Sequence, residues 1–199
     1  MSRALYLRSR ALPAVASSLV AAALLAGWAA YELQAARRFG GTARIPVVTL
    51  APMLAAGIVG TGLYTHSDEL DRTAVRAWWP RRLAHLFALT ALAAGGLALA
   101  VPGSPEVFGG QAMVRNVLGA TGIAAGSAAL LGARLSWLPT TVYLSGTYLS
   151  APSTHDGVAT VWAWPMQPGP QPGAWLAACA TYVCGAALYA WRGARPDGD

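Results

Sequence analysis

The feature that most limits what this chain can fold into is a series of long apolar runs that contain almost no charged residue. Only 11% of the 199 residues are charged and 55% are hydrophobic, whereas a soluble domain carries about 25% charged residues. The charges are gathered in short clusters between the runs, which is the distribution expected when the solvent is lipid. We therefore expect an all-α integral membrane protein.

The apolar runs are long enough to predict individual membrane spans. A helix needs about 20 mostly apolar residues to cross about 30 Å of hydrocarbon. Six runs are candidates, the fifth being the shortest and carrying Ser, Thr and Tyr. They predict a single transmembrane domain over residues 1–199, with spans at residues 12–33, 45–64, 83–101, 113–133, 135–151 and 174–191.

The arginines predict the orientation of these spans. If both termini are cytoplasmic, ten arginines lie inside and four outside, in agreement with the positive-inside rule. The net charge of +6 would indicate nucleic acid in a soluble protein, but here it fits topology and lipid headgroups, so no nucleic-acid partner is expected. The absence of lysine, with abundant Ala and Gly, indicates GC-rich coding and hence a bacterial plasma membrane.

The connection between the second and third spans has the pattern of a short cytoplasmic amphipathic helix. Ser67 can cap its N-terminus, acidic residues follow in the first turn, and Pro80 is expected to end it. A helix this short is marginal alone, so it either lies on the headgroups as a linker or docks a cytosolic partner. The candidate docking residues are Ser67, Asp68, Glu69, Leu70, Asp71, Arg72, Val75, Arg76, Trp78 and Trp79.

The connection before the last span, residues 152–172, is predicted to lie outside and is rich in Pro and Trp. Its pattern is typical of a re-entrant or interfacial segment rather than a crossing helix. Trp162, Trp164 and Met166 are candidates for an extracellular gate, and an aromatic belt is an equally good interpretation, because tryptophan prefers the membrane interface. In the fourth span, Gly119, Gly122 and Gly126 permit close helix packing.

The spans carry few groups that could do chemistry. Glu32, Arg115 and Arg134 all lie near predicted span ends, which argues against a carrier driven by a proton or ion relay. The two cysteines, Cys179 and Cys184, point about 140° apart on one helix and are expected to be buried and inert. A membrane-embedded enzyme that uses His85 or the His155–Asp156 pair is an alternative, but the three histidines show no metal-binding spacing.

Four stretches give the chain a recognisable texture: Glu69 to Ala74, Arg81 to Leu86, Arg115 to Gly119, and Trp162 to Pro168. In this order, on six spans, they resemble the membrane subunits of ABC-2 type ABC exporters. At 199 residues the chain is shorter than typical members of that family.

The resemblance implies a permease subunit without enzyme activity of its own, and no GxxxxGK[ST] phosphate-binding loop is present. It implies that residues 67–79 form a coupling helix in a groove of a separate cytosolic ABC ATPase, which binds ATP and Mg²⁺, while this chain binds no cofactor. It further implies a second permease chain, either identical or related. A membrane scaffold or accessory subunit without its own pathway is the alternative.

Overall fold

A computed structural model of the chain describes residues 12–35, 45–64, 78–101, 108–150 and 158–195. Within these ranges every regular element is a helix, which confirms the predicted helical class. The α-helices and 3₁₀ turns follow in the order α2 (Leu12–Ala35), α3 (Ile45–Gly62), α5 (Trp79–Ala100), α6 (Gly110–Leu131), η2 (Ala133–Leu135), α7 (Trp137–Ser150), α8 (Ala159–Trp162), η3 (Trp164–Met166) and α9 (Pro172–Arg192).

Five helices are long and apolar enough to cross a membrane. They are α2, α3, α5, α6 and α9, which correspond to five of the six predicted spans. The remaining prediction, residues 135–151, coincides with α7, which has 14 residues. At 1.5 Å per residue α7 is about 21 Å long, shorter than the hydrocarbon layer of about 30 Å.

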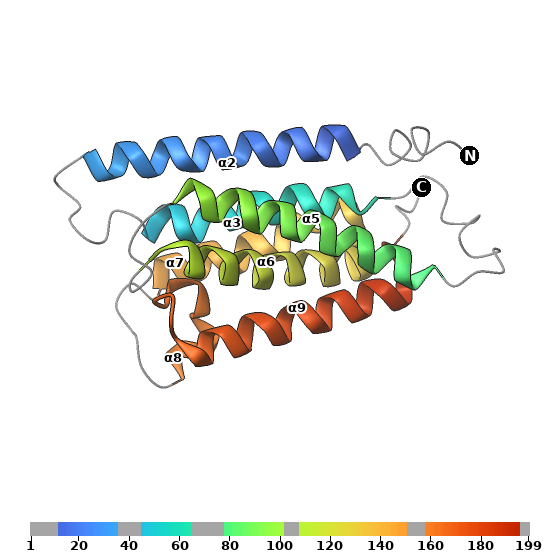
Figure 1. The fold of residues 1–199 in the computed structure, drawn as a ribbon. Coiled ribbons are helices and arrows are strands. Elements are labelled where there is room, and N and C mark those ends of the chain that lie inside the picture. The colour runs from blue at the N-terminus through green and yellow to red at the C-terminus, as the bar shows by residue number, and fades with distance from the viewer. Residues whose placement is uncertain (1–11, 36–44, 65–77, 102–107, 151–157, 196–199) are drawn as a thin grey trace.

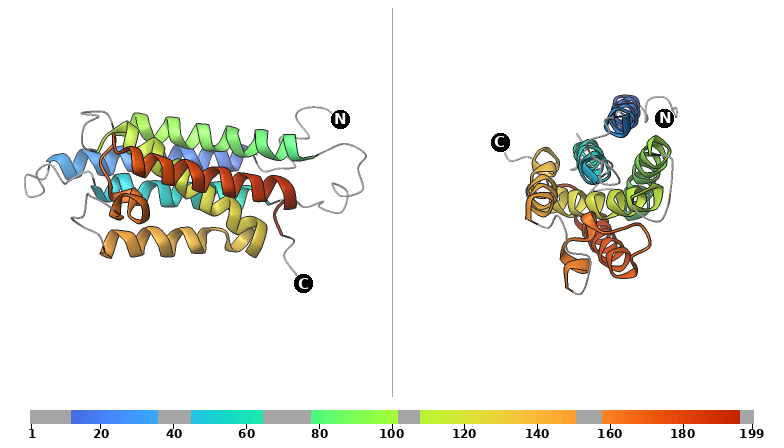
Figure 2. Two further views of the ribbon diagram at one scale, coloured as in Figure 1. Left: turned by 90° about the horizontal axis from the view of Figure 1, so that it is seen from below. Right: turned by 90° about the vertical axis from the view of Figure 1, so that its left-hand side faces the viewer.

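The long helices and α7 run alternately in opposite directions along one bundle (Figure 1). As a result α2 begins and α9 ends at the same end of the bundle, and the short elements α8 and η3 lie at the other end. Helix α6 is the most enclosed, since 67% of its most apolar 18-residue stretch is buried, whereas the value for α2 is 22%. Seen end-on, α2 lies at the rim (Figure 2).

Proline and glycine residues set the ends of several helices. Pro80 lies in the first turn of α5, and the helix that it is predicted to end lies, up to residue 77, outside the described residues. Proline suits this position because its missing N–H would have no helical acceptor there. At the other end, the positive φ angles of Gly132 (95°) and Gly193 (75°) end α6 and α9, and their N–H groups bond to Ala128 O and Tyr189 O.

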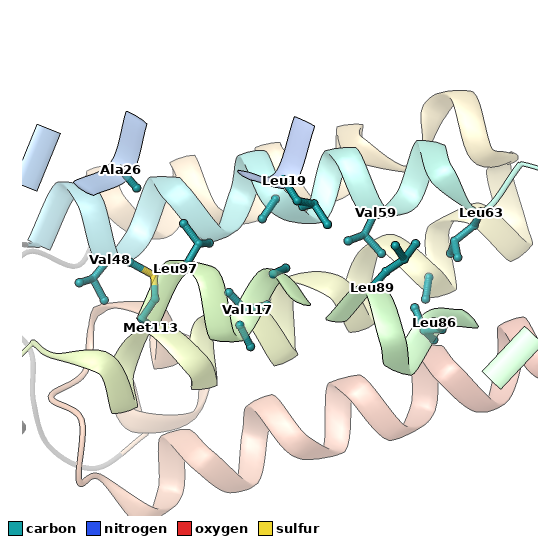
Figure 3. Close-up of a cluster of buried hydrophobic side chains, with 14 of the residues drawn as sticks. Leu19, Ala26, Val48, Val59, Leu63, Leu86, Leu89, Leu97, Met113 and Val117 are labelled. Carbon is teal, nitrogen blue, oxygen red and sulfur yellow. The ribbon is translucent and has the colours of Figure 1, made fainter. Parts of the chain in front are cut away.

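The apolar core lies between α2, α3, α5 and α6. Figure 3 shows Leu19 and Ala26 of α2 beside side chains from the three neighbouring helices. Helix α9 packs against the opposite side of α6. The two backbones are in contact where Gly122 faces Gly185 and Tyr182. Small residues permit such an approach, and in lipid this packing replaces the hydrophobic drive between helices.

Candidate functional site

The most unusual feature of the bundle is a proline-rich segment, residues 158–171, that folds back along the helices instead of crossing them. It contains α8 and η3, and its Trp164 indole lies directly on Gly119 of α6. Gly119 is nine residues after the first residue of α6, or about 14 Å along the axis. The Trp164 ring of the segment therefore lies about 14 Å along α6 from the start of that helix.

Arg115 is the residue that holds this segment. It is the sixth residue of α6 and is completely buried (0% exposed). Its Nη1 donates to Pro168 O and its Nη2 to Gln167 O, both at 2.7 Å, and its Nε donates to Asn116 Oδ1 at 3.1 Å. The guanidinium thus donates hydrogen bonds of equal length to two successive backbone carbonyls.

Asn116 adds a second connection from the next position of α6. Its Nδ2 donates to Pro165 O at 2.8 Å and to Val48 O at 2.9 Å. Because Val48 belongs to α3, this one amide joins α3, α6 and the proline-rich segment. We call Arg115 and Asn116 the clasp.

The need for the clasp follows from the composition of the segment. Prolines at 165, 168, 170 and 172 supply carbonyl oxygens but no N–H donors. Irregular backbone at membrane depth must find hydrogen-bond partners within the protein, since lipid offers none. Arginine has five N–H donors and no acceptor, so it matches a surplus of carbonyls. The clasp therefore supplies the hydrogen-bond donors that water would supply to these carbonyls outside a membrane.

The charge of Arg115 is stabilised by dipoles in this arrangement. Among the described residues the only acidic side chain is Glu32, which is exposed and lies in the last turns of α2. The oxygens within reach of the guanidinium are backbone carbonyls and one side-chain amide. These groups accept hydrogen bonds without giving up a proton, so the described part of the site forms no proton relay.

Further contacts fix both flanks of the segment. Tyr143 of α7 donates from its hydroxyl to Trp162 O, and its ring lies 5.9 Å from the Trp164 ring. Thr49 of α3 donates to Met166 Sδ at 3.4 Å, and Trp175 of α9 donates from Nε1 to Gly169 O at 2.8 Å. Helices α3, α6, α7 and α9 therefore all hold the segment.

The proposed gate residues thus have different positions. Trp164 and Met166 are buried in the clasped segment, at 3% and 4% exposure, whereas Trp162 is 43% exposed. Only Trp162 has the accessible ring that an interfacial aromatic residue requires. The structure brings Trp164 together with Gly119, whereas Gly122 and Gly126 face α9, Gly126 lying opposite Gly185.

The predicted docking residues are only partly described. Ser67, Asp68, Glu69, Leu70, Asp71, Arg72, Val75 and Arg76 lie outside the described residues. Trp78 precedes α5 and carries the Arg81 guanidinium 4.8 Å from its ring centroid. Trp79 is the first residue of α5 and is 55% exposed, so it belongs to the third span rather than to a separate helix.

Of the groups considered for an enzyme, His85 lies within the described residues. His85 is buried in α5, with its Nε2 at 3.4 Å from Gly62 O, and the His155–Asp156 pair lies outside the described residues. The described ranges contain no group of three His, Cys, Asp or Glu residues that could hold a metal. Cys179 and Cys184 are exposed on α9, so the expectation that they are buried is wrong: Ala174, Ala178 and Tyr182 occupy the buried face instead.

From the sequence, Arg115 is predicted as a charge near a span end and, with Asn116, as part of the Arg115–Gly119 stretch, but neither residue is predicted to hold the proline-rich segment. A usable signal was present, because an adjacent Arg and Asn inside an apolar run must find acceptors, and a proline-rich stretch has more acceptors than donors.

Comparison of the chain with protein-family models, curated protein sequences and solved structures gave no match. The class of the protein therefore follows from its own fold. Five long apolar helices in one bundle, with a buried arginine that has backbone acceptors, define a multi-pass helical membrane protein.

Proposed function

We propose that this chain is the membrane-spanning permease subunit of an ATP-driven exporter in a bacterial plasma membrane. In this proposal it crosses the bilayer six times, both termini are cytoplasmic, and a separate cytosolic ABC ATPase supplies the energy. The ATPase binds ATP and Mg²⁺, and this chain carries no enzyme activity.

The six-span topology is supported by the alternating direction of the helices. Helix α7 completes the alternation, although at about 21 Å it is short for a span. Because its flank lies against the proline-rich segment through Tyr143, protein replaces lipid along part of its length. Five described arginines lie in elements at the end of the bundle where α2 begins, as the positive-inside rule expects of a cytoplasmic face: Arg81, Arg82, Arg134, Arg192 and Arg195.

The observation that carries the proposal is the absence of a free charge within the described spans. Apart from their first and last turns, the described parts of these helices contain one charged residue, Arg115, and three of its N–H groups are engaged by oxygens of the chain. Carriers driven by ion gradients commonly place charged groups inside the membrane. An exporter with no free charge in its described spans would therefore receive its work from a partner.

The partner would act on the connection between α3 and α5. This connection starts and ends at the same end of the bundle as the beginning of α2 (Figure 1), and its sequence offers acidic, basic and aromatic side chains close together, from Ser67 to Trp79. The clasped segment at the opposite end would close the outer face, with Trp162, Trp164 and Met166 forming part of that closure. A second copy or a related permease would complete the pathway.

The scaffold alternative is favoured by the character of the packing. The cavity of about 450 Å³ between α2 and α5 is lined by apolar side chains and glycines, and α6 meets α9 backbone to backbone. A chain without a pathway of its own would need no more than this. The two functions can be distinguished by blocking the inside of the bundle in an assembly that still forms. Transport should stop if this chain is a permease and should continue if it is a scaffold.

The decisive experiment is purification from the native membrane followed by charge reversal in the connection. We expect an ABC ATPase to copurify, and Asp68→Arg, Glu69→Arg and Arg72→Glu in combination to uncouple ATP hydrolysis from transport. The matched control is Arg37→Glu with Arg38→Glu, which reverses charges in the first predicted outer loop. Normal coupling in the triple variant would refute the docking role.

A further inference from the structure

Helix α2 is attached to the bundle by weaker contacts than any other long helix. Between Pro13 and Leu33 its side chains form one hydrogen bond, from Ser17 Oγ to Ala14 O within α2 itself. Its buried residues lie in a single stripe, three of the four being alanine: Leu19, Ala22, Ala26 and Ala30. Since no interhelical hydrogen bond joins this part of α2 to the other described residues, van der Waals packing holds it in lipid, from this stripe and from partly buried neighbours such as Val15 and Leu33.

A groove runs along the outer side of that packing, where Ala23 approaches Gly96. It lies between α2 and α5, has a volume of about 450 Å³, and is lined by residues 19–28 of α2 and 92–100 of α5. Trp28 and Leu99 at its edge are 64% and 82% exposed, so the groove opens away from the bundle.

The opposite wall of the groove is held firmly. Thr90 of α5 accepts a hydrogen bond from Tyr182 Oη of α9 at 3.2 Å, and the Phe87 and Tyr182 rings meet edge to face at 5.7 Å. At its start, α5 places the Arg82 guanidinium against Gly193 at the end of α9. Helix α9 is in turn packed against α6, which carries the clasp.

We propose that α2 is a movable wall of the bundle and that α3, α5, α6, α7, α9 and the proline-rich segment form a fixed unit. Movement of α2 away from α5 widens the groove between them without breaking a described side-chain hydrogen bond. Movement of the proline-rich segment would break the three hydrogen bonds of the clasp that end on its carbonyls, at Pro165, Gln167 and Pro168. The opening of this protein is therefore lateral, at α2, and not at the segment that carries Trp164 and Met166.

Pulsed electron paramagnetic resonance on the full chain in lipid nanodiscs tests this directly. After Cys179→Ser and Cys184→Ser, spin labels are placed at three exposed positions of α2, α7 and α9, namely Leu24, Val142 and Val183. We expect a broad or divided distance distribution for Leu24–Val183 and a narrow one for the control pair Val142–Val183. A Leu24–Val183 distribution as narrow as the control would overturn the proposal. Because all three positions are exposed, the variants keep the packed core.

A cross-link gives a second test. A Cβ built on Gly96 lies 3.4 Å from Ala23 Cβ, close to the spacing of about 3.5–4.5 Å that a disulfide requires. Ala23→Cys with Gly96→Cys should form a disulfide that narrows the Leu24–Val183 distribution, and reduction should restore its width. An unchanged distribution after complete oxidation would contradict the proposal.

A role of α2 movement in transport rests on the proposed function, and it is tested by a separate transport measurement. In the assembly with its ATPase, we expect the α2–α5 disulfide to abolish transport reversibly. The control is Gly57→Cys with Trp137→Cys, which links α3 to α7 at positions whose Cβ atoms lie 3.5 Å apart and should leave transport intact. If no ATPase or transport is found, the proposed function fails while the resonance experiment still decides whether α2 moves. If the Gly57–Trp137 link abolishes transport, the fixed unit is wrong.

Discussion

Replacing Arg115 with methionine removes three hydrogen bonds but keeps a long, flexible, apolar side chain of similar reach. The carbonyls of Gln167 and Pro168 and the Asn116 amide oxygen then lose their donors at membrane depth. Hydrogen bonds to charged groups contribute about 1.5–3 kcal/mol each, which gives an upper value of about 9 kcal/mol for three. Interhelical bonds measured in a membrane protein average about 0.6 kcal/mol, which gives a lower value of about 2 kcal/mol.

We therefore expect Arg115→Met to lower the free energy of unfolding by at least about 2 kcal/mol. The free energy of unfolding of Arg115→Lys should lie between those of the methionine variant and the wild type. An ammonium group keeps the charge but cannot donate two parallel hydrogen bonds to neighbouring carbonyls. Arg192→Met is the matched control, since Arg192 is exposed and its guanidinium lies 5.3 Å from the centroid of the Trp191 ring.

Two measurements check this prediction. The first is unfolding by dodecyl sulfate in mixed micelles, followed through tryptophan fluorescence. The second is the thiol-labelling rate of Met166→Cys in a chain without Cys179 and Cys184, because residue 166 is 4% exposed and should become accessible when the clasp is lost. If Arg115→Met unfolds like the wild type and residue 166 stays protected, the clasp does not hold the segment and our reasoning is refuted.

Two further substitutions test the packing around this site. Gly185→Ala should destabilise the protein by about 1–3 kcal/mol in thermal unfolding in detergent, because the added methyl group would overlap the Gly122 carbonyl. The control Gly95→Ala, whose added methyl group meets nothing within 4 Å, should leave the unfolding temperature unchanged or slightly higher. Equal effects of the two substitutions would contradict the close crossing of α6 and α9. Gly193→Ala should lower the free energy of unfolding by about 1–3 kcal/mol in the same assay, because Gly193 has φ of 75° and lies against the Arg82 guanidinium. An unchanged unfolding transition would contradict the conformation described for this end of α9.

The class of the protein and the position of its helices are encoded locally. Apolar runs of sufficient length between charged clusters predict membrane helices because lipid penalises every unpaired backbone group and every charge, and this penalty acts on each span separately. For that reason five predicted spans coincide with long apolar helices. The same local chemistry predicts an irregular path where prolines follow Trp162 and Trp164.

Some local signals have two valid meanings. Pro80 can follow one helix and begin the next, and it lies in the first turn of α5. Cysteine is small and apolar enough for a buried position, but the face that α9 turns inward is decided by where Gly185 must meet Gly122, and this rotation leaves Cys179 and Cys184 outside.

The clasp depends on tertiary structure, since its parts come from distant positions. Arg115 and its acceptors are 52 and 53 residues apart, and Asn116 reaches Val48 across 68 residues. Nothing in a run of amino acids states which carbonyls a buried guanidinium will meet, because that depends on how α3, α6 and the proline-rich segment pack together. Helices form one at a time from local hydrogen bonds and hydrophobicity, whereas a buried charge can be solvated only after the assembled bundle has placed several backbone dipoles around it.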